Sequence, residues 1–162
     1  SEEKGIDNTL ELTDPLQAED FARKTRCNSL AVSIGTLHGI NKFSGKPHLH
    51  IDILKKIKHL VSVPLVLHGA SNIDQKIVSS LKKQGVKIKK SQGLSEAVLK
   101  EAIKNGIRKV NFDTDINLAM LDNFMKTAKN GEVGFKFYKI MEDVAGKTGM
   151  DIMKKIKFIS RR

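Results

Sequence analysis

Two histidines follow apolar segments of the chain in the same way, and each is followed by a glycine. His38 comes after the apolar residues 29–37, and His68 comes after residues 63–67. A short apolar run is typical of a buried parallel strand, which would place each imidazole at the carboxyl end of its strand. Because a helical pattern separates the two segments, we expect neighbouring strands whose histidines converge. Converging imidazoles on an α/β scaffold predict a metal site.

The other three histidines are interpreted as solvated or packing residues. His48 and His50 lie in a polar loop, and His59 lies on a predicted helix. A catalytic zinc ion usually takes three protein ligands, and this chain offers two clear ones.

Polar residues follow the predicted strands and could bind an anion. Those at or after the ends of the second and third strands include Gly69, Ser71, Asn111, Asp113 and Thr114. Glycine lets a ligand oxygen approach backbone N–H groups, and the polar side chains supply or orient further donors. The structural interpretation is a plain strand-to-helix turn at 69–71 and a helix cap at 111–114. Short motifs occur often by chance, so each motif alone leaves both interpretations open.

The elements that must position these residues alternate along the chain. Strands are expected over 30–37, 64–67 and 108–112. Helices are expected over 15–25, 51–60, 77–83, 96–105, 115–129 and 135–159, while 85–90 is ambiguous. This alternation predicts a parallel sheet with helices packed on it. A (β/α)8 barrel takes about 250 residues, so this chain could hold fewer than half of its strands.

Turn and cap residues set the expected helix starts. The first helix would begin after Thr13 or Asp14, with Phe21 and Ala22 on its apolar side. The third would begin near Asn72 or Asp74, and Ser95 would cap the fourth. The chain opens on a polar stretch without a methionine, which we interpret as a fragment or a processed chain.

Composition indicates a globular protein of one domain. Of the 162 residues, 40% are hydrophobic, and Cys27 is the one cysteine. A single cysteine excludes an intramolecular disulfide and fits a reducing compartment. No apolar stretch reaches the roughly 20 residues of a membrane span, and no signal peptide pattern is present. We therefore expect a soluble cytoplasmic protein without a membrane partner.

The chain is strongly basic, which raises the question of a nucleic-acid partner. Lysine and arginine number 29 against 18 acidic residues, a net charge of +11. The lysines lie mostly on predicted helix exteriors: Lys55, Lys56, Lys58, Lys82, Lys83, Lys154, Lys155 and Lys157. Aromatic residues are only 5%, so stacking platforms for bases are scarce. Nucleic-acid binding is therefore not expected as the main role.

Three segments together resemble a known family. They are 34–39 (IGTLHG), 66–71 (VLHGAS) and 109–115 (KVNFDTD). In order and spacing they resemble the class II, zinc-dependent fructose-bisphosphate aldolases, which are (β/α)8 barrels, over most of the chain. The resemblance implies an α/β fold that forms the C-terminal portion of such a barrel, with about three strands and a helical C-terminal tail. Residues 1–130 would belong to the barrel, and 131–162 would extend the same domain.

The resemblance also implies roles for individual residues. His38 and His68 would be zinc ligands. One substrate phosphate and the dihydroxyacetone portion would be surrounded by Gly39, Gly69, Ser71, Asn111, Asp113 and Thr114. Glu3, with Glu2 as the second choice, would transfer a proton from a mobile loop. Main-chain carbonyls near Gly39 and Gly69 would hold a monovalent cation.

The activity implied is cleavage of fructose 1,6-bisphosphate, a phosphorylated ketose, into dihydroxyacetone phosphate and glyceraldehyde 3-phosphate, with zinc as Lewis acid. The family's first histidine ligand, its neighbouring aspartate, a glutamate near the metal and its Asp-Pro-Arg segment have no counterpart here. We expect the fragment alone to be inactive and to need the N-terminal half or homo-oligomerisation. The alternatives are an aldolase for tagatose bisphosphate or another ketose phosphate, and a non-catalytic phosphate- or nucleic-acid-binding module.

Overall fold

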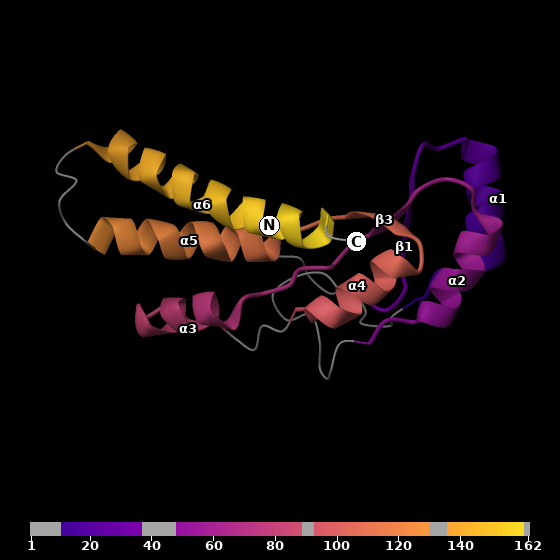
Figure 1. The fold of residues 1–162 in the computed structure, drawn as a ribbon, viewed down its shortest axis with the longest axis horizontal. Helices are drawn as coiled ribbons and strands as arrows, with labels where there is room; N and C mark the ends of the chain where they lie inside the picture. The colour runs from indigo at the N-terminus through magenta and orange to yellow at the C-terminus, as the bar shows by residue number, and fades with distance from the viewer. Residues whose placement is uncertain (1–10, 37–47, 89–92, 130–135, 161–162) are drawn as a thin grey trace.

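The chain folds as three parallel strands surrounded by helices, and the computed structural model describes residues 11–36, 48–88, 93–129 and 136–160 (Figure 1). The strands β1 (Leu30–Val32), β2 (Leu65–Leu67) and β3 (Ile107–Val110) form one sheet in that order. The helices are α1 (Pro15–Thr25), α2 (Ile51–Leu60), α3 (Gln75–Lys83), α4 (Glu96–Lys104), α5 (Thr114–Lys129) and α6 (Phe137–Ser160). The α/β fold predicted from the alternating pattern is confirmed.

Three helices begin where their capping residues predict. The side-chain oxygens of Asp14, Asp74 and Ser95 accept backbone N–H groups in the first turns of α1, α3 and α4. These bonds satisfy donors that have no partner within the helix. Within the described residues, no helix has the length and apolar character needed to cross a membrane.

β1 is shorter than predicted, because it ends at Val32. The backbone of Ser33 bonds to Thr13 instead of β2: Thr13 N–H donates to Ser33 O, and Ser33 N–H donates to Thr13 Oγ1, both at 2.8 Å. The next carbonyl, that of Ile34, accepts from His50 N–H at 2.8 Å. The strand prediction was therefore wrong over 33–36, since partners distant in the sequence satisfy these backbone groups, and residue 37 lies outside the described residues.

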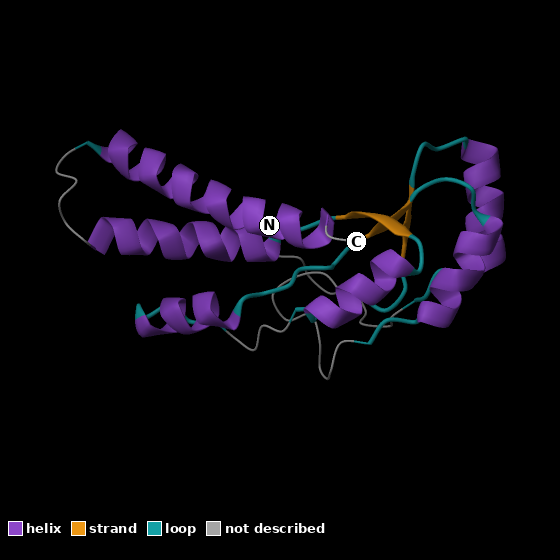
Figure 2. Cartoon of the chain, viewed as in Figure 1, coloured by secondary structure: helices purple, strands orange, loops and turns teal. Residues whose placement is uncertain are grey.

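The main core joins the three strands, drawn in orange in Figure 2, to α1, α2 and α4. Leu54 and Ile57 lie one turn apart on α2, and both side chains are fully buried. At most 1% of the surface is exposed in Leu67 of β2, Leu99 of α4 and Ile107 of β3. This spacing aims one apolar stripe of each helix at the sheet. The strands are short, so the position of their carboxyl ends depends on this packing.

The predicted apolar side of α1 is wrong in one residue. Phe21 is 54% exposed, whereas Ala18 is buried and Ala22 is half-buried. Ala22 lies one turn after Ala18 and shares its face, while Phe21 projects from a neighbouring face of the helix. α1 therefore uses small residues to approach the sheet.

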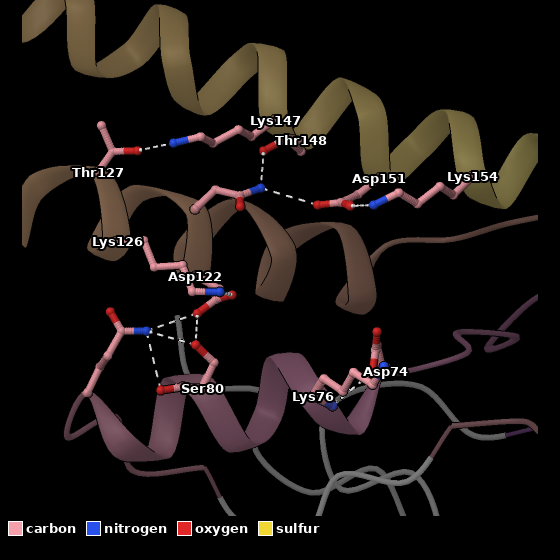
Figure 3. Close-up of polar contacts among 12 residues, drawn as sticks. Asp74, Lys76, Ser80, Asp122, Lys126, Thr127, Lys147, Thr148, Asp151 and Lys154 are labelled. Atoms are coloured by element: carbon pink, nitrogen blue, oxygen red, sulfur yellow. Dashed lines mark hydrogen bonds and ion pairs between the residues drawn. The ribbon is translucent and has the colours of Figure 1, made fainter. Parts of the chain in front are cut away.

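α5 and α6 lie side by side as a long antiparallel pair (Figure 1). Asn123 of α5 donates to Thr148 Oγ1 and to Asp151 Oδ2 of α6, each at 3.3 Å, and Thr127 Oγ1 donates to Asp143 Oδ2 at 2.6 Å. The contacts of Thr148 and Asp151 appear between the two upper helices of Figure 3. They fix the position of α6 along α5.

A buried carboxylate joins α5 to α3. Asp122 Oδ1 accepts from Ser80 Oγ at 2.6 Å and from Gln84 Nε2 at 2.9 Å, while Lys126 Nζ lies 2.6 Å from Oδ2 (Figure 3). The Asp122 side chain is 4% exposed. A buried charge with several donors is costly to disturb, because the partners are then left unpaired.

Replacing Asp122 with alanine should therefore destabilise the fold. We expect a loss of about 1–3 kcal/mol in the free energy of unfolding, measured by urea titration. The matched control is Asp20→Ala, which removes an exposed carboxylate that pairs only within α1. The control should leave the urea midpoint unchanged, and equal midpoints for the two variants would contradict the assigned role of Asp122.

Acid should loosen the contact between α5 and α6. Hydrogen bonds from Lys147 and then Thr127 hold the pKa of the Asp143 carboxyl below its usual value. A carboxyl with a lowered pKa in the folded state stabilises the fold above its unfolded pKa, about 3.9, and this contribution is lost as the pH falls further. Asp143→Asn should therefore flatten the decline of the urea midpoint between about pH 5 and pH 2. A decline as steep as that of the unsubstituted chain would exclude this contribution.

Candidate functional site

The carboxyl edge of the sheet brings His68 and Asn111 into contact. β2 and β3 pair with Leu67 opposite Val110, and Asn111 N–H donates to Leu67 O at 3.0 Å. The residues that follow each strand therefore meet at one edge, where Asn111 Nδ2 lies 3.1 Å from His68 Nε2. His68 was predicted to converge with His38, whereas Asn111 was among the residues that the resemblance implies around the substrate.

This contact suits a ring nitrogen that carries a lone pair. An amide nitrogen donates hydrogen bonds, so the contact fits an unprotonated His68 Nε2 that accepts from Asn111. A neutral imidazole with an unprotonated nitrogen is also what zinc requires of a histidine ligand. A lone pair that accepts from Asn111 is not free to bind a metal, so His68 fits a ligand role through Nδ1, with Nε2–H donating to the Asn111 amide oxygen once the amide is turned over. In the part of the chain that the structure describes, no group of three or more His, Cys, Asp and Glu could hold a metal ion.

The predicted symmetry between the two histidines is wrong. β1 ends at Val32, which pairs with Leu67, so the residue in register with His68 is Ser33. His38 follows Ser33 by five residues and does not directly follow the strand. His38 itself lies outside the described residues, as do three other predicted site residues: Glu2, Glu3 and Gly39.

The loop after β2 is held by a distant segment. Ser71 is 1% exposed, and its carbonyl accepts from Leu94 N–H at 2.9 Å. The Asn72 side chain returns a hydrogen bond to Leu94 O at 2.6 Å. Gly69, at the start of this loop, has a φ of +60°, a conformation that glycine adopts readily. The 69–71 turn, which was predicted to bind an anion, is therefore held at the carboxyl edge of the sheet by hydrogen bonds to Leu94.

The first turn of α3 is already occupied by a protein carboxylate. α3 begins at Gln75, and Asp74 caps it by accepting from Lys76 N–H at 2.8 Å. An anion near Ser71 would therefore meet the backbone N–H groups of the 69–71 turn and not the first N–H groups of the helix.

The loop after β3 places its polar residues in two environments. Thr114 opens α5 and is 8% exposed, whereas Asp113 is exposed. Asp113 Oδ1 accepts from Asn117 Nδ2 at 2.9 Å, and its carbonyl accepts from Asn117 N–H at 3.0 Å. Both contacts are local to the start of α5 and agree with the structural interpretation of this segment as a helix start.

Sequence reasoning missed the residue that contacts both loops. Lys155 was assigned to a solvated helix face, but its side chain is 23% exposed and its ammonium lies 2.5 Å from Asp115 Oδ2. Its place on α6 follows the helical period of the buried residues Val144 and Thr148, eleven and seven positions earlier. That period is the signal that could have identified it.

A pocket of about 520 Å³ lies beside these contacts. The start of α3, the first turn of α5 and the C-terminal half of α6 wall it. Its lining includes Asn72, Asp74, Phe112, Asp115, Lys154 and Lys155. His68 and Asn111 do not line it, so the pocket is separate from the His68–Asn111 contact.

Comparisons with known proteins point in one direction. The sequence model described as "Fructose-bisphosphate aldolase class-II" matches residues 1–161. A fructose-bisphosphate aldolase of Helicobacter pylori is 39% identical over 128 residues, which are 79% of this chain and 42% of that protein. A fructose-bisphosphate aldolase of Cupriavidus necator is 36% identical over 157 residues, 94% of this chain and 45% of that protein.

A solved structure agrees with the sequence comparisons. The crystal structure of the YdjI aldolase from Escherichia coli K12 superposes with a TM-score of 0.67 at 33% identity, covering 92% of this chain and 46% of that one. This likeness confirms the predicted part of an aldolase barrel. The chain spans less than half the length of each of these relatives.

Gly93 is the position most sensitive to an added methyl group at this site. A Cβ there would lie 2.2 Å from Ser71 O and 2.6 Å from Ile73 N, both backbone atoms that cannot turn aside. Gly93→Ala should therefore displace the loop after β2 and cost about 1–3 kcal/mol of stability, measured by urea titration. Gly149→Ala is the control, because nothing lies within 4 Å of its added Cβ.

The control should raise stability by up to about 1 kcal/mol, since alanine favours a helix interior over glycine. Equal changes for the two variants would show that the 93–94 segment does not hold the loop.

Proposed function

Because the chain belongs to the class-II fructose-bisphosphate aldolase family, we propose that it forms part of the active site of an enzyme that cleaves fructose 1,6-bisphosphate to dihydroxyacetone phosphate and glyceraldehyde 3-phosphate. The observation that carries this proposal is the contact between His68 and Asn111 at the carboxyl edge of the sheet. In barrels of this class of fold, the carboxyl ends of the strands carry the active site.

His68, together with His38, would hold the zinc ion that the family uses. Zinc, when bound, supplies Lewis-acid polarisation of the substrate's ketone carbonyl. The role of Asn111 is to orient the His68 ring, because its amide is 3.1 Å from Nε2 and its own backbone is fixed by Leu67. To bind zinc through Nδ1, the ring would donate Nε2–H to the Asn111 amide oxygen, which requires the amide to turn over while the ring keeps its place.

The two loops would bind one phosphate and the dihydroxyacetone portion of the substrate. The proposed residues are Gly39, Gly69, Ser71, Asn111, Asp113 and Thr114. Backbone N–H groups of the 69–71 turn and the N-terminus of α5 are suited to an anion, because both present donors with partial positive charge. Exposed Asp113 is suited to accept hydrogen bonds from substrate hydroxyl groups.

Proton transfer and the second ion are assigned to residues outside the described part. We propose Glu3, or else Glu2, as the carboxylate that moves the proton, since a carboxylate is a suitable general base. Carbonyls near Gly39 and Gly69 would hold a monovalent cation.

The remaining part of the barrel would come from another segment or another copy of the chain. β1 and β3 are the outer strands of the sheet, and an unpaired parallel edge exposes backbone donors and acceptors. Residues 1–130 would contribute to the barrel, and 131–162 would extend it as a helical element. A cytoplasmic location is consistent with the single free Cys27.

The test is zinc-dependent cleavage of fructose 1,6-bisphosphate. It is measured on the chain alone and on the chain co-expressed with the segment of the Cupriavidus necator relative that it does not span. We expect a chelator to abolish activity and zinc to restore it. His68→Ala should lower kcat/KM at least about 100-fold and reduce the bound zinc. His59→Ala, at an exposed position of α2, should change neither.

Activity that survives the chelator, or that is equal in the two histidine variants, would contradict the proposal, as would an inactive assembled complex. Tagatose 1,6-bisphosphate is assayed in parallel, and we expect the lower kcat/KM for it. Activity only in the co-expressed preparation would support the partner assignment.

A further inference from the structure

Lys155 reaches from α6 to both loops of the candidate site. Its Nζ lies 2.5 Å from Asp115 Oδ2, donates to Asn72 O at 3.0 Å and stands over the Phe112 ring at 5.1 Å from the centroid. Asn72 belongs to the loop after β2, while Phe112 and Asp115 belong to the loop after β3 and the turn that follows it. One ammonium group therefore joins two loops that are separated along the sequence.

Each contact lies next to a residue proposed to bind substrate. Asn72 follows Ser71 in the chain, Phe112 separates Asn111 from Asp113, and Asp115 follows Thr114. In these three contacts Lys155 touches Asn72, Phe112 and Asp115, and none of the proposed binding groups. Its influence on the site would thus act through the position of the loops.

Other ion pairs among the described residues do not join elements in this way. They connect side chains three or four positions apart on one helix: Arg23–Asp20, Lys24–Asp20, Lys126–Asp122, Lys147–Asp143 and Lys154–Asp151. The Lys155–Asp115 pair spans from α6 to the first turn of α5. Among the described residues, Lys155–Asp115 is therefore the ion pair that joins two different helices.

The burial of Asp115 makes this contact hard to replace. The Asp115 side chain is 3% exposed, and apart from the ion pair with Lys155 neither oxygen has a partner within the described residues. The charge of Lys155, close to Oδ2, is therefore what compensates the buried carboxylate. Removing one partner of a buried pair leaves an uncompensated charge, so the turn would move to reach water.

We propose that Lys155 is a positioning residue, whose ammonium fixes the spacing of the loops after β2 and β3 that bind the substrate phosphate. This inference rests on the proposed function. It predicts an effect on phosphate affinity and KM, because the loops carry the phosphate-binding groups. The zinc ligand His68 lies outside these three contacts, so the bound zinc should be preserved.

The experiment compares Lys155→Met, Lys155→Arg and Lys154→Met in the preparation that cleaves substrate. KM, kcat, bound zinc and inhibition by inorganic phosphate are measured for each variant. Lys155→Met should raise KM and the inhibition constant of phosphate at least about tenfold, with a smaller change in kcat and unchanged zinc. Lys155→Arg should restore both constants to near the unsubstituted values. Lys154→Met removes an exposed ammonium next to Lys155 and should leave both constants unchanged.

The outcomes separate this inference from the proposed function. No cleavage and no phosphate effect in the unsubstituted protein would overturn the function, and this inference with it. Normal cleavage with an unchanged KM in Lys155→Met would overturn the positioning role alone. If Lys155→Met does not fold, Asp115→Asn removes the same charge pair with little change in side-chain volume. It should raise KM as well, and an unchanged KM would overturn the inference.

Discussion

The parallel pairing of β2 with β3 is the interaction on which the candidate site depends. Leu67 lies opposite Val110, and the hydrogen bond from Asn111 N–H to Leu67 O extends the pairing by one residue. A shift of one residue would turn alternate side chains to the opposite face and separate His68 from Asn111. The register is held by the buried side chains on both strands, so apolar packing determines which polar groups meet at the edge.

Around this edge, polar contacts between distant segments hold the loops. Leu94 pairs with the loop after β2, and Lys155 joins that loop to the first turn of α5. The α5–α6 contacts fix α6 and so place Lys155. α6 comes after all three strands in the sequence, and it thereby helps to set the geometry of a candidate site that it does not line. Phosphate-binding loops need this kind of support, because backbone donors act only when they are held at the right spacing.

The sequence correctly predicted the features that depend on neighbouring residues. Asp14, Asp74 and Ser95 predicted the starts of their helices, and His68 was correctly placed at a strand end, since caps and apolar runs depend on neighbouring residues. It failed where partners are distant. The bonds from Thr13 and His50 end β1 early, and the burial of Lys155 requires Asp115, forty positions away. The family resemblance supplied the proposed roles of residues such as Asn111, which spacing alone left open.

Zinc-edge anomalous diffraction from crystals grown with zinc and inorganic phosphate tests the central claim most directly. The account predicts a zinc peak about 2.0–2.1 Å from a ring nitrogen of His68. It also predicts phosphate density against the 69–71 turn and the start of α5. Zinc bound only at the exposed histidines His48 or His59, with no phosphate at this edge, would contradict it.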